Sequence, residues 1–400
     1  MEFTGEISQK LIEYLKQEDI RNICINLGIF SNLDSLEEKL EKTKIYITET
    51  MKGKFIGDRA TDKFLNVIKY YLRNEDFERF YGDEYIPDGF INHNLVLPVV
   101  GERRNGFRVS NDVLGFDGKK YIVKDAEGLR KGAAGRKYVK DARYNPTVAY
   151  AFFKFLGMPC ARNLPACEKI PNYCIFSENF LKENQKAYEL EDEKFIDTEF
   201  LIDEDNNITH KQIMDGIEET IEKKNLSPDK VSLLNKKIKL QYAVQETLKC
   251  LVFSIDQNLR NTSLIVTEGE NGIIEDINVS PAYDLDLSFN LGEEMLNAVP
   301  ENEILYRTTQ DGKIDLTSII NEFKSIEGYK ETLQEMKNKL NGDYIDQIFD
   351  IAYDETKVNM FNNKELRDRF GNFIMRRVAI FKEAYKEVFE KDDKSKTNII

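Results

Sequence analysis

The sequence predicts an α+β fold in which strands are confined to two stretches of an otherwise helical chain. Short apolar runs bounded by glycine, proline or Asp-Gly indicate strands between about residue 95 and residue 178, and again from 262 to 279. Apolar residues at helical spacing dominate before residue 95 and after residue 185. The 400-residue chain is 41% hydrophobic and contains 25 Phe and 19 Tyr, which is enough to bury more than one core.

Residues 1–95 are predicted to form a helical accessory segment. Its first helix is indicated by apolar residues on one face: Ile7, Leu11, Ile12 and Leu15. Asp34 and Glu37 have the spacing of a capping box ahead of a second amphipathic stretch. Phe64 begins a further apolar stripe. This segment carries no motif that indicates chemistry.

The stretch from 96 to 178 is predicted to be a small unit of strands with one helix. Leu95–Val100 is a short apolar run, and Leu114–Phe116 and Tyr121–Lys124 flank an Asp-Gly turn in the manner of a β-hairpin. Tyr173–Phe176 is a further strand candidate.

One helix is expected inside this unit. Asn145 is placed to cap it, Pro146 suits its first position, and Gly157 with Pro159 would end it.

Helices dominate from residue 185 onward, interrupted by one hairpin. A buried helical stripe is predicted from apolar positions spaced along one face: Val244, Leu248, Leu251, Val252 and Ile255. Two strands follow, Thr262–Val266 and Ile273–Val279, joined by a glycine-containing turn. Residues 315–390 are expected to be helical, and 391–400 to be a frayed tail.

Charge and histidine content disfavour several classes of function. A formal net charge of −14 argues against general binding to nucleic acids or anionic membranes, because both need a basic surface. Only two histidines occur, which disfavours hydrolases built on a histidine base. There is no apolar run of about 20 residues to span a bilayer, and no basic start with an apolar run typical of a signal peptide. We therefore expect a cytoplasmic protein with no direct contact to nucleic acid or membrane.

Three oxygen-bearing side chains are expected to converge around the hairpin. Asn261 precedes its first strand, Asp284 lies just beyond its second, and Asp256 stands one loop turn before Asn261. The two ends of a hairpin lie together, so these groups can share one site. Carboxylate and amide oxygens suit Mg²⁺, and a carboxylate that binds no metal can accept the proton of an attacking hydroxyl. This arrangement suits phosphoryl transfer, but the Asp-x-x-x-x-Asn spacing taken alone is more typical of ordinary turns, which use both residues freely.

The residues around these side chains resemble a known family. Ile255–Ile265, read as IDQNLRNTSLI, resembles the catalytic loop of HipA-like serine/threonine kinases, which are distant relatives of phosphoinositide kinases. Ser280–Leu285, read as SPAYDL, resembles the metal-binding segment of the same family. The resemblance implies that Asp256 is the catalytic base, that Arg260 places a cation near the transferred phosphate, and that Asn261 and Asp284 bind Mg²⁺.

The resemblance extends upstream to the binding of ATP. Lys124 is similar to the family's phosphate-binding lysine, while Glu178 and Phe180 correspond to a hinge that flanks the adenine. The acidic partner of Lys124 is left open between Glu127 and Asp141. The phosphate-binding loop is left open between residues 105–110 and 132–135.

The resemblance implies a two-lobed, protein-kinase-like fold and an ATP-dependent protein kinase. The expected lobes are a small β-rich one, residues 96–178, and a large, mostly helical one, residues 179–390. The implied reaction transfers the γ-phosphate of Mg-ATP to a serine or threonine of a protein, and autophosphorylation is compatible with it. A lipid kinase and a non-catalytic ATP-binding protein are the alternatives. An antitoxin-like protein is the partner that the family implies.

Overall fold

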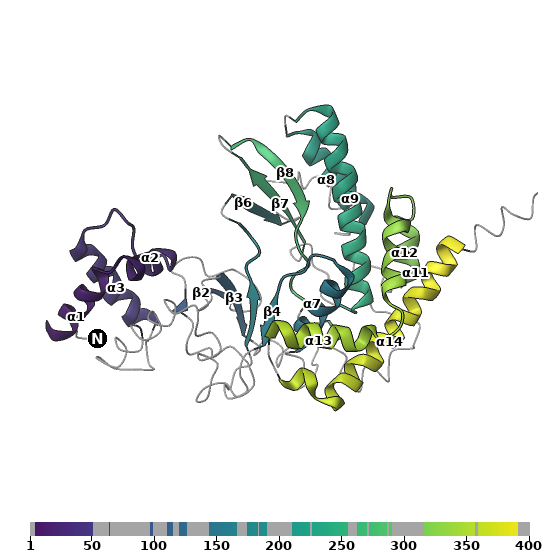
Figure 1. Ribbon diagram of the computed structural model, residues 1–400. Coiled ribbons are helices and arrows are strands. Elements are labelled where there is room, and N and C mark those ends of the chain that lie inside the picture. Colours follow the sequence, from purple (N-terminus) through teal and green to yellow (C-terminus); the bar gives the residue numbers. More distant parts are fainter. Residues whose placement is uncertain are drawn as a thin grey trace, which may run out of the picture. The chain divides into compact units, whose positions relative to one another are not determined.

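The structure is a computed structural model. The described residues are 5–50, 64, 97–98, 110–114, 120–125, 144–165, 174–182, 184–189, 210–224, 226–254, 262–269, 272–285, 288–289, 316–356 and 359–390. The chain divides into two compact units, which are described separately below (Figure 1). The first comprises Met1–Gly135, Asn163–Asn179 and Thr356–Val358, and the second comprises the remainder.

The first unit begins with three helices that share a hydrophobic core. They are α1 (Gly5–Leu15), α2 (Glu18–Asn26) and α3 (Leu36–Thr50). The predicted stripe of α1 is confirmed, with Leu11 and Leu15 almost fully buried, and Phe64 packs into the same core.

The predicted capping box at Asp34 and Glu37 is wrong by one residue. Ser35 and Glu38 form the reciprocal pair: the Ser35 amide donates to Glu38 Oε2 at 2.7 Å, and the Glu38 amide donates to Ser35 Oγ at 3.2 Å. Asp34 instead accepts from the amide of Ser31 at 2.7 Å. It is not needed as the cap, because the hydroxyl of Ser35 accepts from the Glu38 amide.

The first unit also contains a five-stranded antiparallel sheet in the order β1-β2-β3-β5-β4. Its strands are β1 (Leu97–Pro98), β2 (Ser110–Leu114), β3 (Lys120–Asp125), β4 (Asn163–Pro165) and β5 (Cys174–Glu178). The predicted hairpin is confirmed as β2–β3, although its first strand lies mostly upstream of the predicted one. The Asp-Gly turn lies outside the described residues, and β4 was not predicted.

The second unit begins with the predicted helix, α7 (Asn145–Leu156). Gly157 ends it in the left-handed conformation, with φ 81°, as expected for a residue without a Cβ. The prediction that Asn145 caps the helix is wrong. Tyr144 occupies the cap position without a side-chain hydrogen bond, and Asn145 lies inside the first turn, where it is buried.

A three-stranded sheet in the second unit contains the predicted hairpin. Its order is β6 (Gln185–Glu189), β7 (Ser263–Glu268) and β8 (Ile274–Val279), all antiparallel. Leu264 pairs with Val279, so the start of β7 lies beside the end of β8. The edge strand β6 was not predicted.

Helix α9 (Pro228–Leu251) is the centre of the second unit, and the sheet lies along it through β8 (Figure 1). Around it pack α8 (His210–Glu222), α11 (Leu316–Phe323), α12 (Tyr329–Lys339) and α14 (Lys364–Tyr385). The rest of the C-terminal region comprises α13 (Tyr344–Thr356), the short helix η7 (Asn359–Asn362) and the π-helical turn η8 (Lys386–Glu390).

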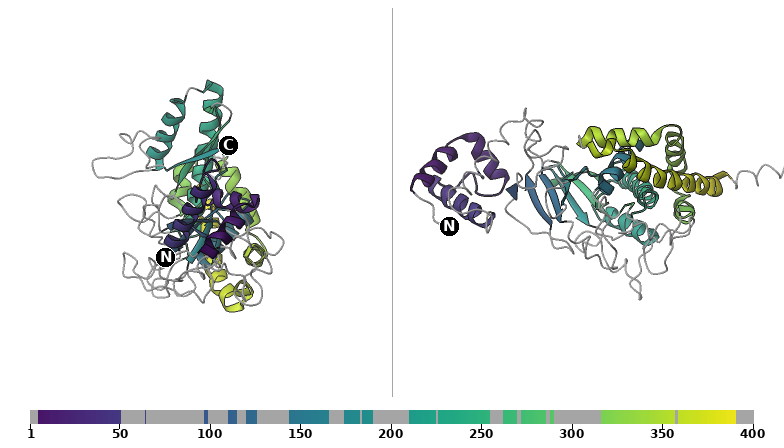
Figure 2. Two further views of the ribbon diagram at one scale, coloured as in Figure 1. Left: turned by 90° about the vertical axis from the view of Figure 1, so that its left-hand side faces the viewer. Right: turned by 90° about the horizontal axis from the view of Figure 1, so that it is seen from below.

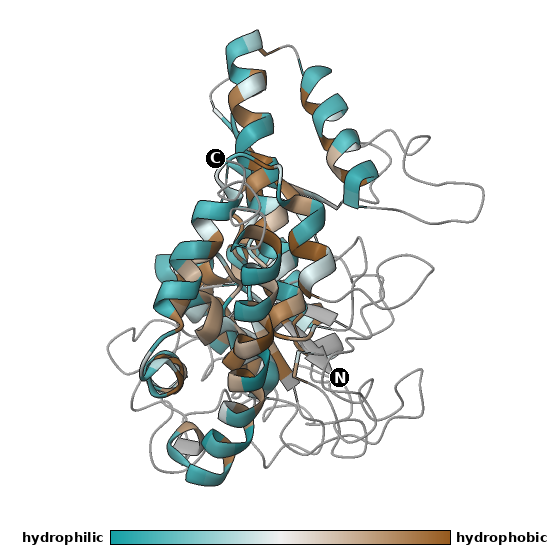
Figure 3. Ribbon diagram, turned by 90° about the vertical axis from the view of Figure 1, so that its right-hand side faces the viewer, coloured by the Kyte–Doolittle hydropathy of each residue, from teal (hydrophilic) through white to brown (hydrophobic). Residues whose placement is uncertain are grey.

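The helical arrangement is explained by amphipathic faces. The views of Figure 2 show α8 alongside α9, and the colouring of Figure 3 shows apolar and polar residues alternating around the helices. Val244, Leu248, Leu251 and Val252 are buried, which confirms the predicted stripe as far as Val252. The helix ends at Leu251, Val252 belongs to its cap, and Ile255 lies outside the described residues. In the described part of the chain, no helix is long and apolar enough to cross a membrane.

Candidate active site

The two ends of the β7–β8 hairpin are joined by hydrogen bonds. The Ser263 amide donates to Ser280 Oγ at 3.2 Å, and the Ser280 amide donates to the Ser263 carbonyl at 2.8 Å. Both serines are almost fully buried. The expectation that the hairpin ends meet is therefore confirmed. Ser263 and Ser280 therefore lie side by side, with Thr262 and Pro281 as their neighbours in the chain.

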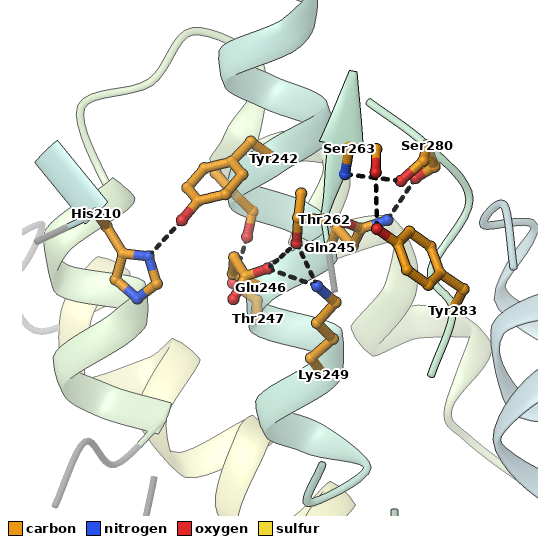
Figure 4. Close-up of polar contacts among 11 residues, drawn as sticks. His210, Tyr242, Gln245, Glu246, Thr247, Lys249, Thr262, Ser263, Ser280 and Tyr283 are labelled. Atoms are coloured by element: carbon orange, nitrogen blue, oxygen red, sulfur yellow. Dashed lines mark hydrogen bonds and ion pairs between the residues drawn. The ribbon is translucent and has the colours of Figure 1, made fainter. Parts of the chain in front are cut away.

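The segment that follows β8 is fixed through its backbone. Ala282 forms an isolated parallel bridge with Cys160: its carbonyl accepts from the Ala161 amide at 2.8 Å, and its amide donates to the Pro159 carbonyl at 3.1 Å. Gln245 of α9 donates from Nε2 to the Ser280 carbonyl at 2.7 Å (Figure 4). These contacts hold the chain immediately before Asp284.

Tyr283 joins two of the predicted site segments. Its hydroxyl lies 2.7 Å from Ser263 Oγ at the start of β7, and its ring centroid lies 5.7 Å from that of Phe180 (Figure 4 labels Tyr283 and Ser263). Phe180 was predicted to flank the adenine, and Asp284 is the next residue after Tyr283. The structure thus brings Phe180 and the Asp284 segment together through a residue that sequence analysis missed.

Asp284 has a backbone conformation that most residues avoid. Its φ is 56°, in the left-handed region, and its side chain is half-buried. Asp tolerates this region better than most side chains, but a left-handed residue still costs of order 1–2 kcal/mol. Such outliers persist where the surrounding structure holds them, and they cluster at functional sites. Among the described residues, the other non-glycine outliers are Phe253 and Phe289.

Those two phenylalanines lie at the end of α9 and just beyond the Asp284 segment. The Phe253 amide donates to the Cys250 carbonyl at 3.0 Å and the Ser254 amide to the Lys249 carbonyl at 2.9 Å, which is the Schellman arrangement. The Phe289 amide donates to the Val252 carbonyl at 3.1 Å. The end of α9 and the chain after Asp284 are therefore hydrogen-bonded neighbours.

Helix α14 supports both of these turns. Phe373 contacts the rings of Phe253 and Phe289, with centroids 6.1 Å and 5.6 Å apart. Arg377 donates to the carbonyls of Cys250 and Leu251 at 2.8 Å and 3.2 Å. Burial lowers the pKa of the Arg377 guanidinium, which also lies 5.6 Å from the Phe253 ring centroid.

A buried ion pair of α9, Lys249 with Glu246, contacts the residue before β7. Lys249 Nζ donates to Glu246 Oε1 at 2.9 Å and to Thr262 Oγ1 at 2.6 Å, as Figure 4 shows. The Lys249 and Glu246 side chains are only 3% and 4% exposed. Both residues were missed by sequence analysis, because a lysine and a glutamate three residues apart on a helix ordinarily belong to its solvent-exposed face.

Two of the remaining predicted site residues lie in described strands, and three lie outside the described ranges. Lys124 lies in β3 opposite Ile175 of β5, and Glu178 lies in β5 opposite Tyr121, so both belong to the sheet of the first unit. Predicted site residues outside the described ranges are Asp256, Arg260 and Asn261.

The alternatives left open in the sequence mostly fall outside the described residues as well. These are Glu127, Asp141, residues 105–109 and residues 132–135. Ser110 is described as the first residue of β2. No cluster of three or more His, Cys, Asp or Glu side chains that could hold a metal occurs in the described ranges.

Asp284 is the described residue whose chemistry suits Mg²⁺. Its carboxylate is a hard oxygen donor and is half-buried. Asp284 follows the end of β8, which is hydrogen-bonded to the start of β7, and Asn261 precedes β7 in the sequence. Asp276, on the same hairpin, is engaged differently. Burial alone would raise the pKa of Asp276, but the ion pair with Lys237 at 2.5 Å and a hydrogen bond from Asn278 hold it below its usual range.

Comparison with known proteins shows the class of fold. No family model matches the sequence, and no curated protein matches it. Among solved structures, the fold is similar to that of a kinase, which makes it a kinase-like α+β fold.

That kinase is CtkA, a proinflammatory kinase of Helicobacter pylori. The TM-score is 0.52 at 13% sequence identity, and the match covers 75% of this chain and 98% of CtkA. A second structure is HipA of Shewanella oneidensis, determined with HipB and operator DNA. The TM-score there is 0.41 at 12% identity, with 87% of this chain and 84% of that chain covered.

Proposed function

We propose that this chain is an ATP-dependent protein kinase that transfers the γ-phosphate of Mg-ATP to a serine or threonine hydroxyl. The proposal rests mainly on the backbone conformation and the position of Asp284. A carboxylate with a strained, firmly held backbone lies at the end of the hairpin that also begins next to Asn261. The kinase-like fold and the resemblance of residues 255–265 and 280–285 to HipA-like kinases support the same reaction.

Each proposed residue has a separate task in the transfer. Asp256 accepts the proton of the substrate hydroxyl, while Asn261 and Asp284 hold Mg²⁺ through their side-chain oxygens. When bound, Mg²⁺ neutralises charge on the phosphate oxygens of ATP. Lys124 and Arg260 provide further positive charge for the phosphates.

The base of ATP is proposed to bind at the chain segment that contains Glu178 and Phe180. Phe180 would stack on the adenine, and the backbone around Glu178 would supply hydrogen bonds. The ring contact between Phe180 and Tyr283 supports this assignment, because it connects the proposed base contact to the residue before Asp284. An antitoxin-like protein partner rests on the family resemblance and is part of the proposal.

Transfer of labelled γ-phosphate tests the proposal. Purified wild-type protein is incubated with Mg-ATP and a generic protein acceptor, beside Asp256→Asn, Asp284→Asn and the control Asp276→Asn. We expect label on the wild-type chain or the acceptor, loss of at least 100-fold in the first two variants, and near wild-type transfer by the control. Asp276 is a suitable control because its carboxylate already pairs with Lys237.

The outcomes separate the alternatives. Absence of both transfer and Mg-dependent ATP binding in the wild-type protein would reject the kinase. Binding without transfer to any acceptor would favour the non-catalytic ATP-binding protein. Phosphorylation of phosphoinositide vesicles without protein labelling would favour the lipid kinase.

A further inference from the structure

Glu246 and Lys249 are buried charges in the middle of the second unit that the proposed reaction does not use. They belong to the last turns of α9, among apolar neighbours such as Leu248 and Cys250, which are fully buried. A buried ion pair is by itself weak evidence of a contribution to stability. Replacing a buried ion pair by well-packed apolar residues is often neutral or stabilising, because the pair has lost its hydration.

The pair supplies a hydrogen bond from α9 to the residue before β7. The ammonium of Lys249, held by Glu246 at 2.9 Å, donates to the hydroxyl of Thr262 at 2.6 Å. Thr262 is only 4% exposed and lies immediately before β7. A charge-assisted hydrogen bond is stronger and more directional than one between neutral groups. Lys249 therefore fixes the position at which β7 starts.

The start of β7 follows Asn261 in the sequence and contacts the residue before Asp284. On one side, Thr262 is bonded covalently to Asn261. On the other, the next residue, Ser263, contacts the Tyr283 hydroxyl at 2.7 Å, and Tyr283 precedes Asp284. Figure 4 shows two groups of contacts beside α9: Lys249 and Glu246 contact Thr262, and Ser263 contacts Ser280 and Tyr283. The two groups are joined by the peptide bond between Thr262 and Ser263, so a shift at Thr262 would reach the Tyr283–Asp284 segment.

We infer that Lys249 is a positioning residue, whose ammonium, held by Glu246, fixes Thr262 and through it the Tyr283–Asp284 segment of the proposed magnesium site. This inference rests on the proposed function for its catalytic meaning. Its structural content, that Thr262 transmits order from Lys249 to the Tyr283–Asp284 segment, is independent of any activity.

The test compares two isosteric substitutions, Thr262→Val and Thr247→Val. Thr262→Val removes the hydroxyl that Lys249 contacts. Thr247→Val removes an equally buried hydroxyl of α9, which contacts the Tyr329 hydroxyl at 2.5 Å. Thr262→Ser restores the hydroxyl. For each variant, the thermal midpoint and the Mg²⁺ concentration that half-saturates ATP binding are measured.

We expect both valine variants to lower the thermal midpoint, since both lose a buried hydrogen bond. Only Thr262→Val should raise the half-saturating Mg²⁺ concentration, by about tenfold or more, the size expected for one charge-assisted hydrogen bond. Thr262→Ser should return it to within about twofold of wild type. Equal Mg²⁺ dependence in Thr262→Val and Thr247→Val would overturn the inference.

Amide hydrogen exchange provides the second readout and needs no nucleotide. In Thr262→Val, the amides of Ser280, Ala282 and Asp284 should exchange faster than in wild type, whereas in Thr247→Val they should not. If the wild-type protein binds no Mg-ATP, the proposed function fails and exchange alone decides the inference. Unchanged exchange at these amides in Thr262→Val would reject it.

Discussion

Asp284 combines a carboxylate with a left-handed backbone, and its neighbours hold both in place. Ser280 and Ala282 are hydrogen-bonded to α9 and to the chain after α7, and Leu285 is buried. This setting leaves the backbone little freedom to relax. Strain that is maintained in this way is typical of residues that serve a reaction and not the stability of the fold.

Replacement of Asp284 by Asn should separate stability from activity. Asn adopts left-handed φ as readily as Asp does, so the backbone at φ 56° remains acceptable. We expect the free energy of unfolding to stay within about 0.5 kcal/mol of wild type, while γ-phosphate transfer is lost. Urea denaturation and the transfer assay measure the two quantities. A loss of transfer that merely follows a large loss of stability would contradict the assignment.

Sequence analysis proposed Asp284 and Phe180 as site residues from motifs, but it gave no role to Tyr283, Glu246 or Lys249. Tyr283 lies inside one of these motifs, yet no spacing indicates its contacts with Ser263 and Phe180. The pair on α9 has the spacing and charges of an ordinary surface ion pair. Only the packing of β8 and the start of β7 on α9 makes these positions interior.

At the scale of elements, the C-terminus of α9 is held by α14. Arg377 is 6% exposed and donates to two carbonyls at the end of α9, while Phe373 contacts the two left-handed phenylalanines beyond it. A cation at a helix C-terminus is favourable because the carbonyls there carry partial negative charge. The ring of Phe253 adds a favourable contact with the guanidinium.

Arg377→Met should therefore destabilise the second unit strongly. The carbonyls of Cys250 and Leu251 would lose the hydrogen bonds from the guanidinium, and the Cys250 carbonyl would keep the one from the Phe253 amide. We expect a loss of about 2–4 kcal/mol in the free energy of unfolding. Arg376→Met is the control, since Arg376 is the exposed neighbour on α14 and should change stability by less than about 0.5 kcal/mol. Urea denaturation measures both, and equal effects would argue against the role of Arg377.

Elements with strong local patterns were predicted well. The β2–β3 and β7–β8 hairpins, α7 and the buried stripe of α9 all carry turn residues or apolar spacing that are local in sequence. Strands β4 and β6 were missed, because β4 has three residues and β6 is a mostly polar edge strand. Both are defined by their partners in the sheet, which no local pattern reveals.

At the scale of the whole molecule, an ion-pair group links distant parts of the second unit. Glu355 of α13 pairs with Lys154 of α7, and with Arg162 at 3.0 Å. Burial alone would raise the pKa of Glu355, but the hydrogen bond from Lys154 and the charge of Arg162 outweigh it and hold the pKa below its usual range.

Stability should consequently depend on pH through Glu355. A carboxyl whose pKa is depressed by folding stabilises the protein above its unfolded pKa of about 4.3, and this contribution is lost as the pH falls through the folded pKa. Glu355→Gln should melt below wild type at pH 7, and the difference should shrink toward pH 3. The exposed Glu335→Gln is the control, with no difference expected at either pH. A constant gap for Glu355→Gln would contradict this account.

The kinase proposal requires that the end of the β7–β8 hairpin binds ATP through Mg²⁺ held by Asp284. Calorimetric titration with ATP, in Mg²⁺ and in excess chelator, tests it most directly when wild type is compared with Asp284→Asn and Asp276→Asn. We expect chelation to weaken ATP binding at least about tenfold in wild type and Asp276→Asn, and Asp284→Asn to bind ATP equally in both conditions. Wild-type binding that ignores Mg²⁺, or an Asp284→Asn variant that responds to Mg²⁺ as wild type does, would contradict it.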